Sequence, residues 1–220
     1  MKTHWKLLFL AAIAASFAPG CALFSKAEKG VPTRFFSLDR VPEGRDADIG
    51  PSAQVQPGAG ELRVGHITGA TQLEERLVYR DSAFEIKYNQ ELRWTEPPEL
   101  YLRRLLSQEL FQKRGLVQVV GGAGATLDVQ INVFEEIRFP QRHVRAQITA
   151  RLHDEHLVLW EKTLTVDRPI AETENGDLPL ETVEALGDAM QTLVDQVADN
   201  VVRTLGARRS VDATPGVVSR

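Results

Sequence analysis

The stretches LDVQINVFE (residues 127–135), VRAQITARL (144–152) and VLWEKTLTV (158–166) decide the fold. In each of them apolar and polar residues alternate, which is the two-residue period of a strand with one buried face. The connections between them are short, one through Pro140 and the other through Asp154-Glu155-His156. Short connections join neighbouring antiparallel strands, so the sequence predicts an antiparallel meander. Its expected apolar face consists of Leu127, Val129, Ile131, Val133, Val144, Ala146, Ile148, Ala150, Leu152, Val158, Trp160, Leu164 and Val166.

Four further segments have the composition of strands. Residues 34–39 (RFFSLD) and 61–67 (ELRVGHI) each predict one strand. Residues 77–80 (LVYR) and 84–89 (FEIKYN) flank the turn-forming Asp81-Ser82-Ala83, which predicts a hairpin. The expected sheet therefore extends well beyond the meander.

Two segments repeat apolar residues at helical spacing. The first runs from Thr95, as a side-chain cap, through Pro97-Pro98 in the first turn to a stop at Gly115. The second covers residues 181–205 and has an apolar stripe opposite a polar face. We expect this stripe to pack on the domain's own sheet; contact with a second copy, giving a homo-oligomer, is the alternative. The stripe consists of Val183, Leu186, Met190, Leu193, Val197, Val201 and Leu205.

Together these elements predict an α/β fold: a single domain with a mixed, mostly antiparallel sheet and two long amphipathic helices packed on one face. The domain is expected over residues 34–205. Residues 41–60, which are rich in Pro and Gly, predict a mobile loop within it. Residues 206–220 show no periodicity and are expected to form a disordered tail.

Residues 1–20 have the anatomy of a secretory signal peptide. Lys2 and Lys6 precede the apolar run LLFLAAIAASFA, residues 7–18. Twelve helical residues span about 18 Å, well short of a hydrocarbon core about 30 Å thick, so a permanent membrane span is not expected. Ordinary signal peptidase would cut before Leu23, whereas the lipoprotein route would modify Cys21.

Cys21 is the only cysteine in the chain, and Ala18-Pro19-Gly20 precedes it. This segment resembles the bacterial lipobox at Gly20 and Cys21 and departs from it at Ala18 and Pro19. We interpret Cys21 as a lipidation site that carries acyl chains such as palmitate, followed by a linker, so that residues 21–33 form the lipidated N-terminus. Ala22 replaces the Asp that is usual in inner-membrane retention signals, which favours the periplasmic face of the outer membrane.

The charge of the chain argues against a nucleic-acid partner. Loss of residues 1–20 removes two lysines and leaves 24 Lys and Arg against 30 Asp and Glu, a net charge of about −6 with His neutral. A protein of this charge is repelled by phosphate backbones and anionic surfaces. We therefore expect the lipid anchor, and not charge, to hold it at a membrane.

The residues that suggest chemistry have simpler interpretations. His143, His153 and His156 lie near Asp154-Glu155, but residues three apart at a hairpin bend do not share a face as helical ligand pairs do. A solvated turn is predicted there, and no metal site.

Two other patterns are likewise interpreted as structural. The Gly-rich residues 119–127 lack the Lys and the following helix of a phosphate loop, so they predict a flexible connection between strands. Glu135 and Glu136 are adjacent in a strand and point to opposite faces, so they are poorly placed to flank one bond. We predict no catalytic residue and no cofactor. A secreted hydrolase that uses His153 or Glu135 is kept as a hypothesis of a different class.

Residues 76–110 carry the most distinctive pattern: a strand LVYR, an aromatic hairpin FEIKY, then Arg93-Trp94, an acidic residue and Pro97-Pro98 before a long helix. This pattern resembles the ABC-type transport auxiliary lipoprotein family, also described as the paraquat-inducible protein C type. A lipidated cysteine before a strand such as RFFSLD and a final amphipathic helix are similar to that family as well.

The resemblance implies a non-enzymatic outer-membrane lipoprotein that helps to move phospholipid or other apolar molecules between the two membranes. It implies two partners, an envelope-spanning MCE-domain protein and an inner-membrane permease. A structural envelope lipoprotein that assists assembly of an outer-membrane complex is the alternative function. The candidate partner-binding residues are Tyr79, Phe84, Tyr88, Arg93, Trp94 and Tyr101, because aromatic side chains supply much of the energy of interfaces. The alternative for the aromatic rings is that they fill the seam between the hairpin and the first helix.

Overall fold

The computed structural model describes residues 32–39, 60–122, 124–171 and 176–212. The chain divides after Pro32, and every element below belongs to the unit Thr33–Arg220. The expected signal peptide, Cys21 and most of the loop at 41–60 lie outside the described residues.

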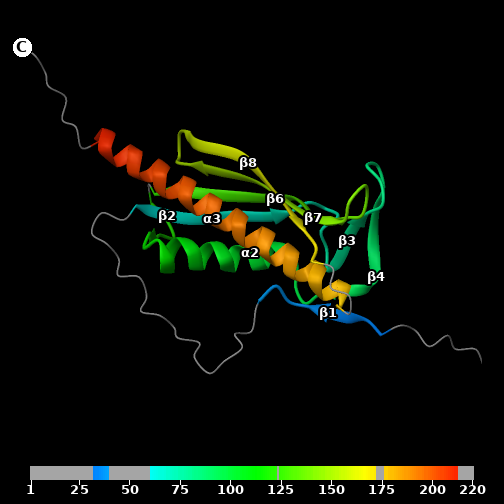
Figure 1. The fold of residues 1–220 in the computed structure, drawn as a ribbon. Helices are drawn as coiled ribbons and strands as arrows, with labels where there is room; N and C mark the ends of the chain where they lie inside the picture. The colour runs from blue at the N-terminus through cyan, green and yellow to red at the C-terminus, as the bar shows by residue number, and fades with distance from the viewer. Residues whose placement is uncertain (1–31, 40–59, 123, 172–175, 213–220) are drawn as a thin grey trace, which may run out of the picture. The chain divides into compact units, whose positions relative to one another are not determined.

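The described residues form a mixed sheet of eight strands and two helices, which confirms the predicted α/β class (Figure 1). The strands are β1 (Arg34–Phe36), β2 (Glu61–Gly69), β3 (Arg76–Arg80), β4 (Ile86–Trp94), β5 (Val117–Gln118), β6 (Ala125–Ile137), β7 (His143–His153) and β8 (Val158–Pro169). The first helix is α2 (Pro98–Ser107), which continues as the π-helical turn η2 (Gln108–Lys113). The second is α3 (Leu178–Asp212).

Strand β6 is the centre of the sheet. On one side its first half pairs with β2 and its last residues pair with β3, both in parallel. On the other side it pairs with β7, and β7 with β8, in the antiparallel meander that the sequence predicts. Strand β4 adds to β3 in an antiparallel hairpin, while β1 joins β4 and β5 joins β2 in parallel. The long pairings are thus antiparallel, and the parallel ones are shorter.

A bulge in β6 corrects the predicted apolar face. Ile131 lies opposite Ile148 and Val133 opposite Gln147, so the register of β6 against β7 shifts by one residue between Ile131 and Val133. An extra residue in one strand turns every later side chain to the other face. Phe134 therefore takes the core position that the alternation assigns to Val133.

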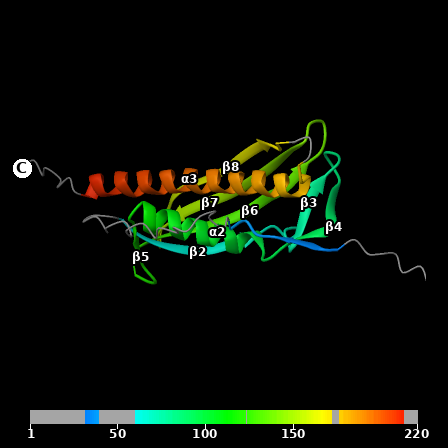
Figure 2. The same cartoon turned by 60° about the horizontal axis from the view of Figure 1, so that its bottom comes forward.

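Both helices cover one face of the sheet, and α2 lies beside α3 (Figures 1 and 2). All seven stripe residues of α3 are buried, which confirms that the stripe packs on the domain's own sheet. The helix extends to Asp212, so residues 206–212 are helical and the prediction that they are disordered is wrong. The opposite face of the meander is polar, as the alternation predicts.

The start of α2 differs from the prediction. Pro97 is the N-cap, and no side chain caps the helix. Pro98 begins the helix without an N–H of its own, and Thr95 lies too far ahead of it to act as the cap. The Thr95 hydroxyl instead hydrogen bonds with the Tyr101 hydroxyl. At the other end Gly115 has a φ of 67°, which confirms it as the C-terminal stop.

Gly65 allows β2 to pass close to β6. A Cβ at this position would lie 2.2 Å from Oδ1 of Asp128 and 2.7 Å from Cγ2 of Thr126. We expect Gly65→Ala to lower the free energy of unfolding by about 1–3 kcal/mol, because the methyl group displaces the Asp128 carboxylate, which accepts a hydrogen bond from the His66 backbone N–H. Denaturant unfolding checks this, with Gly121→Ala, where a Cβ meets nothing within 4 Å, as the control.

Candidate functional site

The six candidate partner-binding residues separate into a buried and an accessible group. Trp94 and Tyr101 are only 3% and 1% exposed. The Trp94 ring packs on Phe134 with a centroid separation of 5.7 Å. These two side chains fill the core between the hairpin and α2, which is the alternative stated for them, and they are not part of the described surface.

The other four candidates are accessible and lie on the β3–β4 hairpin. Phe84, in the turn, is 98% exposed, and Tyr88 is 37% exposed. Tyr79 is half-buried beneath the guanidinium of Arg138. Arg93 is half-buried and donates hydrogen bonds to backbone oxygens at the base of the hairpin. Their role in partner binding stays a prediction.

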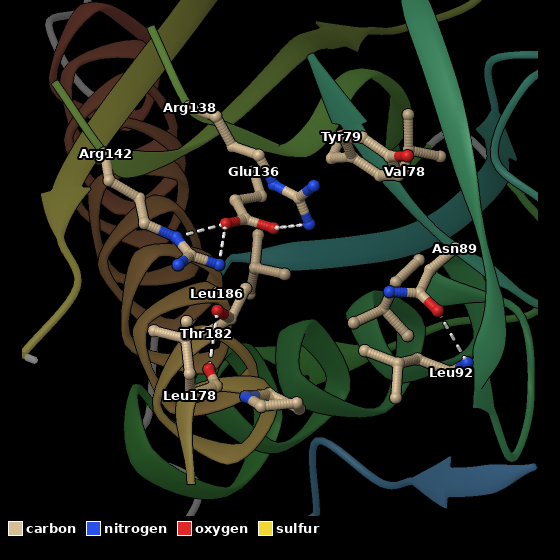
Figure 3. Close-up of a pocket in the computed structure, with 12 residues that line it drawn as sticks. Val78, Tyr79, Asn89, Leu92, Glu136, Arg138, Arg142, Leu178, Thr182 and Leu186 are labelled. Atoms are coloured by element: carbon tan, nitrogen blue, oxygen red, sulfur yellow. Dashed lines mark hydrogen bonds and ion pairs between the residues drawn. The ribbon is translucent and has the colours of Figure 1, made fainter. Parts of the chain in front are cut away.

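A cavity of about 210 Å³ lies where this hairpin, the end of β6 and the first turns of α3 meet (Figure 3). The exposed surface of its wall is mostly apolar, and its charged groups lie on the β6 side, where β6 turns into β7. The residues that line it are Leu77, Val78, Tyr79, Asn89, Leu92, Glu136, Arg138, Arg142, Leu178, Pro179, Thr182 and Leu186.

Glu136 is the centre of the polar wall. Its side chain is only 7% exposed, because the bulge in β6 turns it toward the core face. Arg138 donates a hydrogen bond of 3.0 Å to one carboxylate oxygen, and Arg142 binds the other (Figure 3). A buried carboxylate needs such partners, since desolvation otherwise outweighs its attraction to any single cation. The two arginines thereby fix the β6–β7 turn to the end of β6.

Arg138 also ties the two turns of this end together. Its guanidinium lies 3.7 Å from the centre of the Tyr79 ring, and its backbone N–H donates to the Arg80 carbonyl. Burial disfavours the charge of Arg138, but the hydrogen bond to Glu136 and the nearby Asp81 outweigh it and raise its pKa. The arginine therefore keeps its charge at every accessible pH.

The ion pairs of Glu136 with Arg138 and Arg142 are suited to holding the β6–β7 turn against β6 and not to transferring protons. Both oxygens of Glu136 are occupied by guanidinium groups, and the Thr182 hydroxyl donates to the Leu178 carbonyl. The sequence prediction missed Glu136, Arg138 and Arg142 as members of a site. The segment RFPQR, residues 138–142, held a usable signal: an aromatic residue between two arginines in a turn that is otherwise polar.

Removal of the Glu136 carboxylate is expected to destabilise the domain. We expect Glu136→Ala to lower the free energy of unfolding by about 2 kcal/mol, because two partly buried guanidinium groups lose their acceptor. The matched control is Glu161→Ala, whose carboxylate pairs with Arg151 on the exposed face and should matter little. Equal unfolding midpoints for the two variants would show that the pairing of Glu136 with Arg138 and Arg142 contributes no stability.

The residues considered for metal binding do not come together. His153 faces Asp128 at 3.1 Å, while His143 contacts the Gln141 carbonyl. Over the described part of the chain, no group of three or more His, Cys, Asp or Glu side chains is placed to hold a metal ion. The Gly-rich run connects β5 to β6, as predicted, and Glu135 is buried against Arg80.

Asp154 closes the β7–β8 turn. Its Oδ1 accepts hydrogen bonds of 2.8 Å from the backbone N–H groups of His156 and Leu157, and Arg208 of α3 pairs with it. These donors, the two backbone groups first, lower the pKa of Asp154 from 3.8 to about 2.

The lowered pKa of Asp154 predicts a pH-dependent stability. Because the folded state favours the ionised carboxylate, the stabilisation is complete above pH 4 and is lost as the pH falls toward 2. The difference in unfolding free energy between wild type and Asp154→Asn should therefore shrink over that interval. A difference that stayed constant from pH 6 to pH 2 would contradict the assigned shift.

The family model of the ABC-type transport auxiliary lipoprotein component matches residues 47–198. This match covers more than half of the chain. The chain belongs to this family. The family resemblance drawn from residues 76–110 is thereby confirmed, and the family description assigns the chain to a class of lipoproteins associated with ABC transport.

Solved structures share the fold of this auxiliary lipoprotein. Protein XCC0632 from Xanthomonas campestris, of the family DUF330, superposes with a TM-score of 0.61 at 18% identity, covering 82% of this chain and 100% of its own. A second crystal structure, of an uncharacterised protein, has a TM-score of 0.54 at 16% identity, with 67% and 95% of the two chains covered. At these identities the likeness shows the fold alone. A search of curated proteins gave no match.

Neither helix of the auxiliary lipoprotein, as far as the chain is described, combines the length and the apolar character that a bilayer span needs.

Proposed function

We propose that this chain is a non-enzymatic lipoprotein of an ABC/MCE-type transport system, which moves phospholipid or other apolar molecules between the inner and outer membranes. The observation that carries the proposal is the family match over residues 47–198. The proposed location is the periplasmic face of the outer membrane, with acyl chains on Cys21 as the anchor.

The N-terminal sequence supports the anchor. A short apolar run precedes the only cysteine of the chain, and Ala22 follows it in place of the Asp that would favour the inner membrane. Two or more acyl chains give stable attachment, whereas one chain gives only marginal binding.

The chemistry of the described domain supports a binding role. The buried carboxylates Glu135 and Glu136 are each held by arginine, and the cavity beside Glu136 has mainly apolar walls. A general acid or base needs a group that is free to exchange a proton with a substrate. These carboxylates instead hold strands and turns in place, as suits an auxiliary component that positions other proteins.

In-cell crosslinking followed by purification from native membranes tests the proposal. With an affinity tag at the C-terminus, we expect an MCE-domain protein and an inner-membrane permease as the main products. Deletion of the gene should increase the sensitivity of cells to detergents. If an outer-membrane barrel protein were the main product instead, the chain would be an assembly factor and the transport proposal would be lost.

A further inference from the structure

Two phenylalanine side chains protrude at one end of the domain. Phe84 is 98% exposed in the β3–β4 turn, and Phe139 is 67% exposed in the β6–β7 turn. Figures 1 and 2 both show these two turns next to each other. The backbone N–H of Arg138 donates to the Arg80 carbonyl at 2.9 Å, and the Arg138 guanidinium lies 3.9 Å from Asp81, so protein contacts hold the turns together.

Large exposed aromatic residues on neighbouring turns are costly unless something covers them. We propose that Phe84 and Phe139 dock the domain on the bilayer that carries its anchor, with both rings inserted at the boundary between headgroups and acyl chains. The inference rests on the anchor at Cys21 proposed above, and it assigns a membrane-facing end to the domain.

The linker between Cys21 and the sheet is long enough to bring this end of the domain to the membrane. Arg34 begins the described sheet beside Asp177, which immediately precedes α3, and beside Leu92 of β4. Leu92 is six residues from Ile86 at the end of β4 next to the β3–β4 turn, a distance of about 20 Å along the strand. The twelve residues between Cys21 and Arg34 span at most about 40 Å when extended. The chain is therefore long enough for the two turns to touch the membrane that holds Cys21.

The opposite end of the domain is out of that reach. Helix α3 has 35 residues and a length of about 52 Å. Arg208, near its C-terminal end, pairs with Asp154 of the β7–β8 turn. Leu157 in that turn is also exposed, at 65%, but the helix from Leu178 to Arg208 places it about 45 Å from Arg34, farther than the linker extends.

The shape and charge of this end also fit a bilayer. A protein partner buries an aromatic anchor in a matching pocket, whereas an interface of headgroups and acyl chains closes around a protruding ring. Cations and anions are nearly balanced here: Lys87 faces Asp81, and the two arginines of the β6–β7 turn share Glu136. Insertion should therefore depend little on anionic lipid.

Tryptophan scanning on vesicles tests the inference. The chain from Cys21 to Arg220 is coupled through Cys21 to a maleimide lipid in vesicles of phosphatidylethanolamine and phosphatidylglycerol. Separate variants carry Phe84→Trp, Phe139→Trp or, as the matched exposed control, Leu157→Trp. All three sites are exposed, so thermal unfolding should match that of the parent chain.

Every variant keeps Trp94 and Trp160, so the emission of the parent chain on the same vesicles is subtracted. We expect lipids brominated near the headgroup end of their chains to quench the remaining emission of the variants at positions 84 and 139 about twofold, because interfacial side chains lie ~5–10 Å into this boundary. Position 157 should remain unquenched, and neutral vesicles should give the same result. If positions 84 and 139 were quenched no more than position 157, the inference would be overturned. Phe84 and Phe139 would then be candidates for binding a protein partner.

The coupling chemistry separates this test from the proposed function. Because the maleimide supplies the anchor, the result does not depend on natural acylation. Failure of acylation in cells would contradict the proposed function alone. Unquenched tryptophans on coupled vesicles would contradict only the inference that Phe84 and Phe139 insert into the bilayer.

Discussion

Replacement of Phe134 by alanine is expected to lower the free energy of unfolding by about 3–5 kcal/mol, the largest effect of any single core change considered. The side chain is 2% exposed and packs against Trp94 of β4 from the bulged segment of β6. It thus connects the β3–β4 hairpin to the central strand. Alanine would leave a cavity at this junction, since the surrounding strands are held in register by their own hydrogen bonds.

The matched control is Phe139→Ala, which removes the same side chain five residues later. Phe139 is 67% exposed, so its removal should change the unfolding free energy by no more than about 0.5 kcal/mol. Urea unfolding followed by circular dichroism measures both. If the two variants had the same midpoint, the packing described for Phe134 and Trp94 would be wrong.

Replacement of Cys21 by serine is expected to release the protein from the membrane. Serine keeps the size and polarity of the residue but has no thiol to form the thioether with diacylglycerol. The mature chain carries a net charge of about −6, which disfavours anionic surfaces, and the two exposed phenylalanines alone would give only transient contact. Fractionation of cells should find wild type in the membrane pellet and Cys21→Ser in the soluble fraction.

Ala22→Asp serves as the control, because it keeps the thiol and changes only the sorting residue. This variant should stay in the membrane fraction and move from the outer to the inner membrane. Wild type and Cys21→Ser found together in the soluble fraction would contradict the anchor.

The regular parts of the fold follow from the sequence because their apolar residues are periodic. The meander and α3 have apolar periods of two and 3.6 residues, and the structure confirms the antiparallel pairing and the buried stripe. Register shifts in the meander leave two predicted core residues, Val133 and Val158, off the core face. The bulge between Ile131 and Val133 has no such signal: one inserted residue exchanges the faces of Val133 and Phe134, and only the pairing with β7 reveals it. The extension of α3 through residues 206–212 was missed for a related reason, since charged residues there hide the helical period.

The candidate site was only partly predictable. The aromatic hairpin at 76–94 could be recognised, but a single sequence does not say which rings face inward. Trp94 and Phe84 both belong to this hairpin, yet one is buried and the other is fully exposed. The pairing of Glu136 with Arg138 and Arg142 depends on a strand bulge and a turn that bring residues of opposite charge together. Adjacent letters in the sequence do not show that both Glu135 and Glu136 are buried, each against arginine.

The most direct test of the account is an intact-mass measurement on the mature protein purified from native membranes. The account predicts a chain that begins at Cys21 and carries the added mass of a diacylglycerol, with or without a further acyl chain. A mature chain that begins at Leu23 and has no added mass would contradict it, because the domain would then have no anchor in the membrane where its partners are expected.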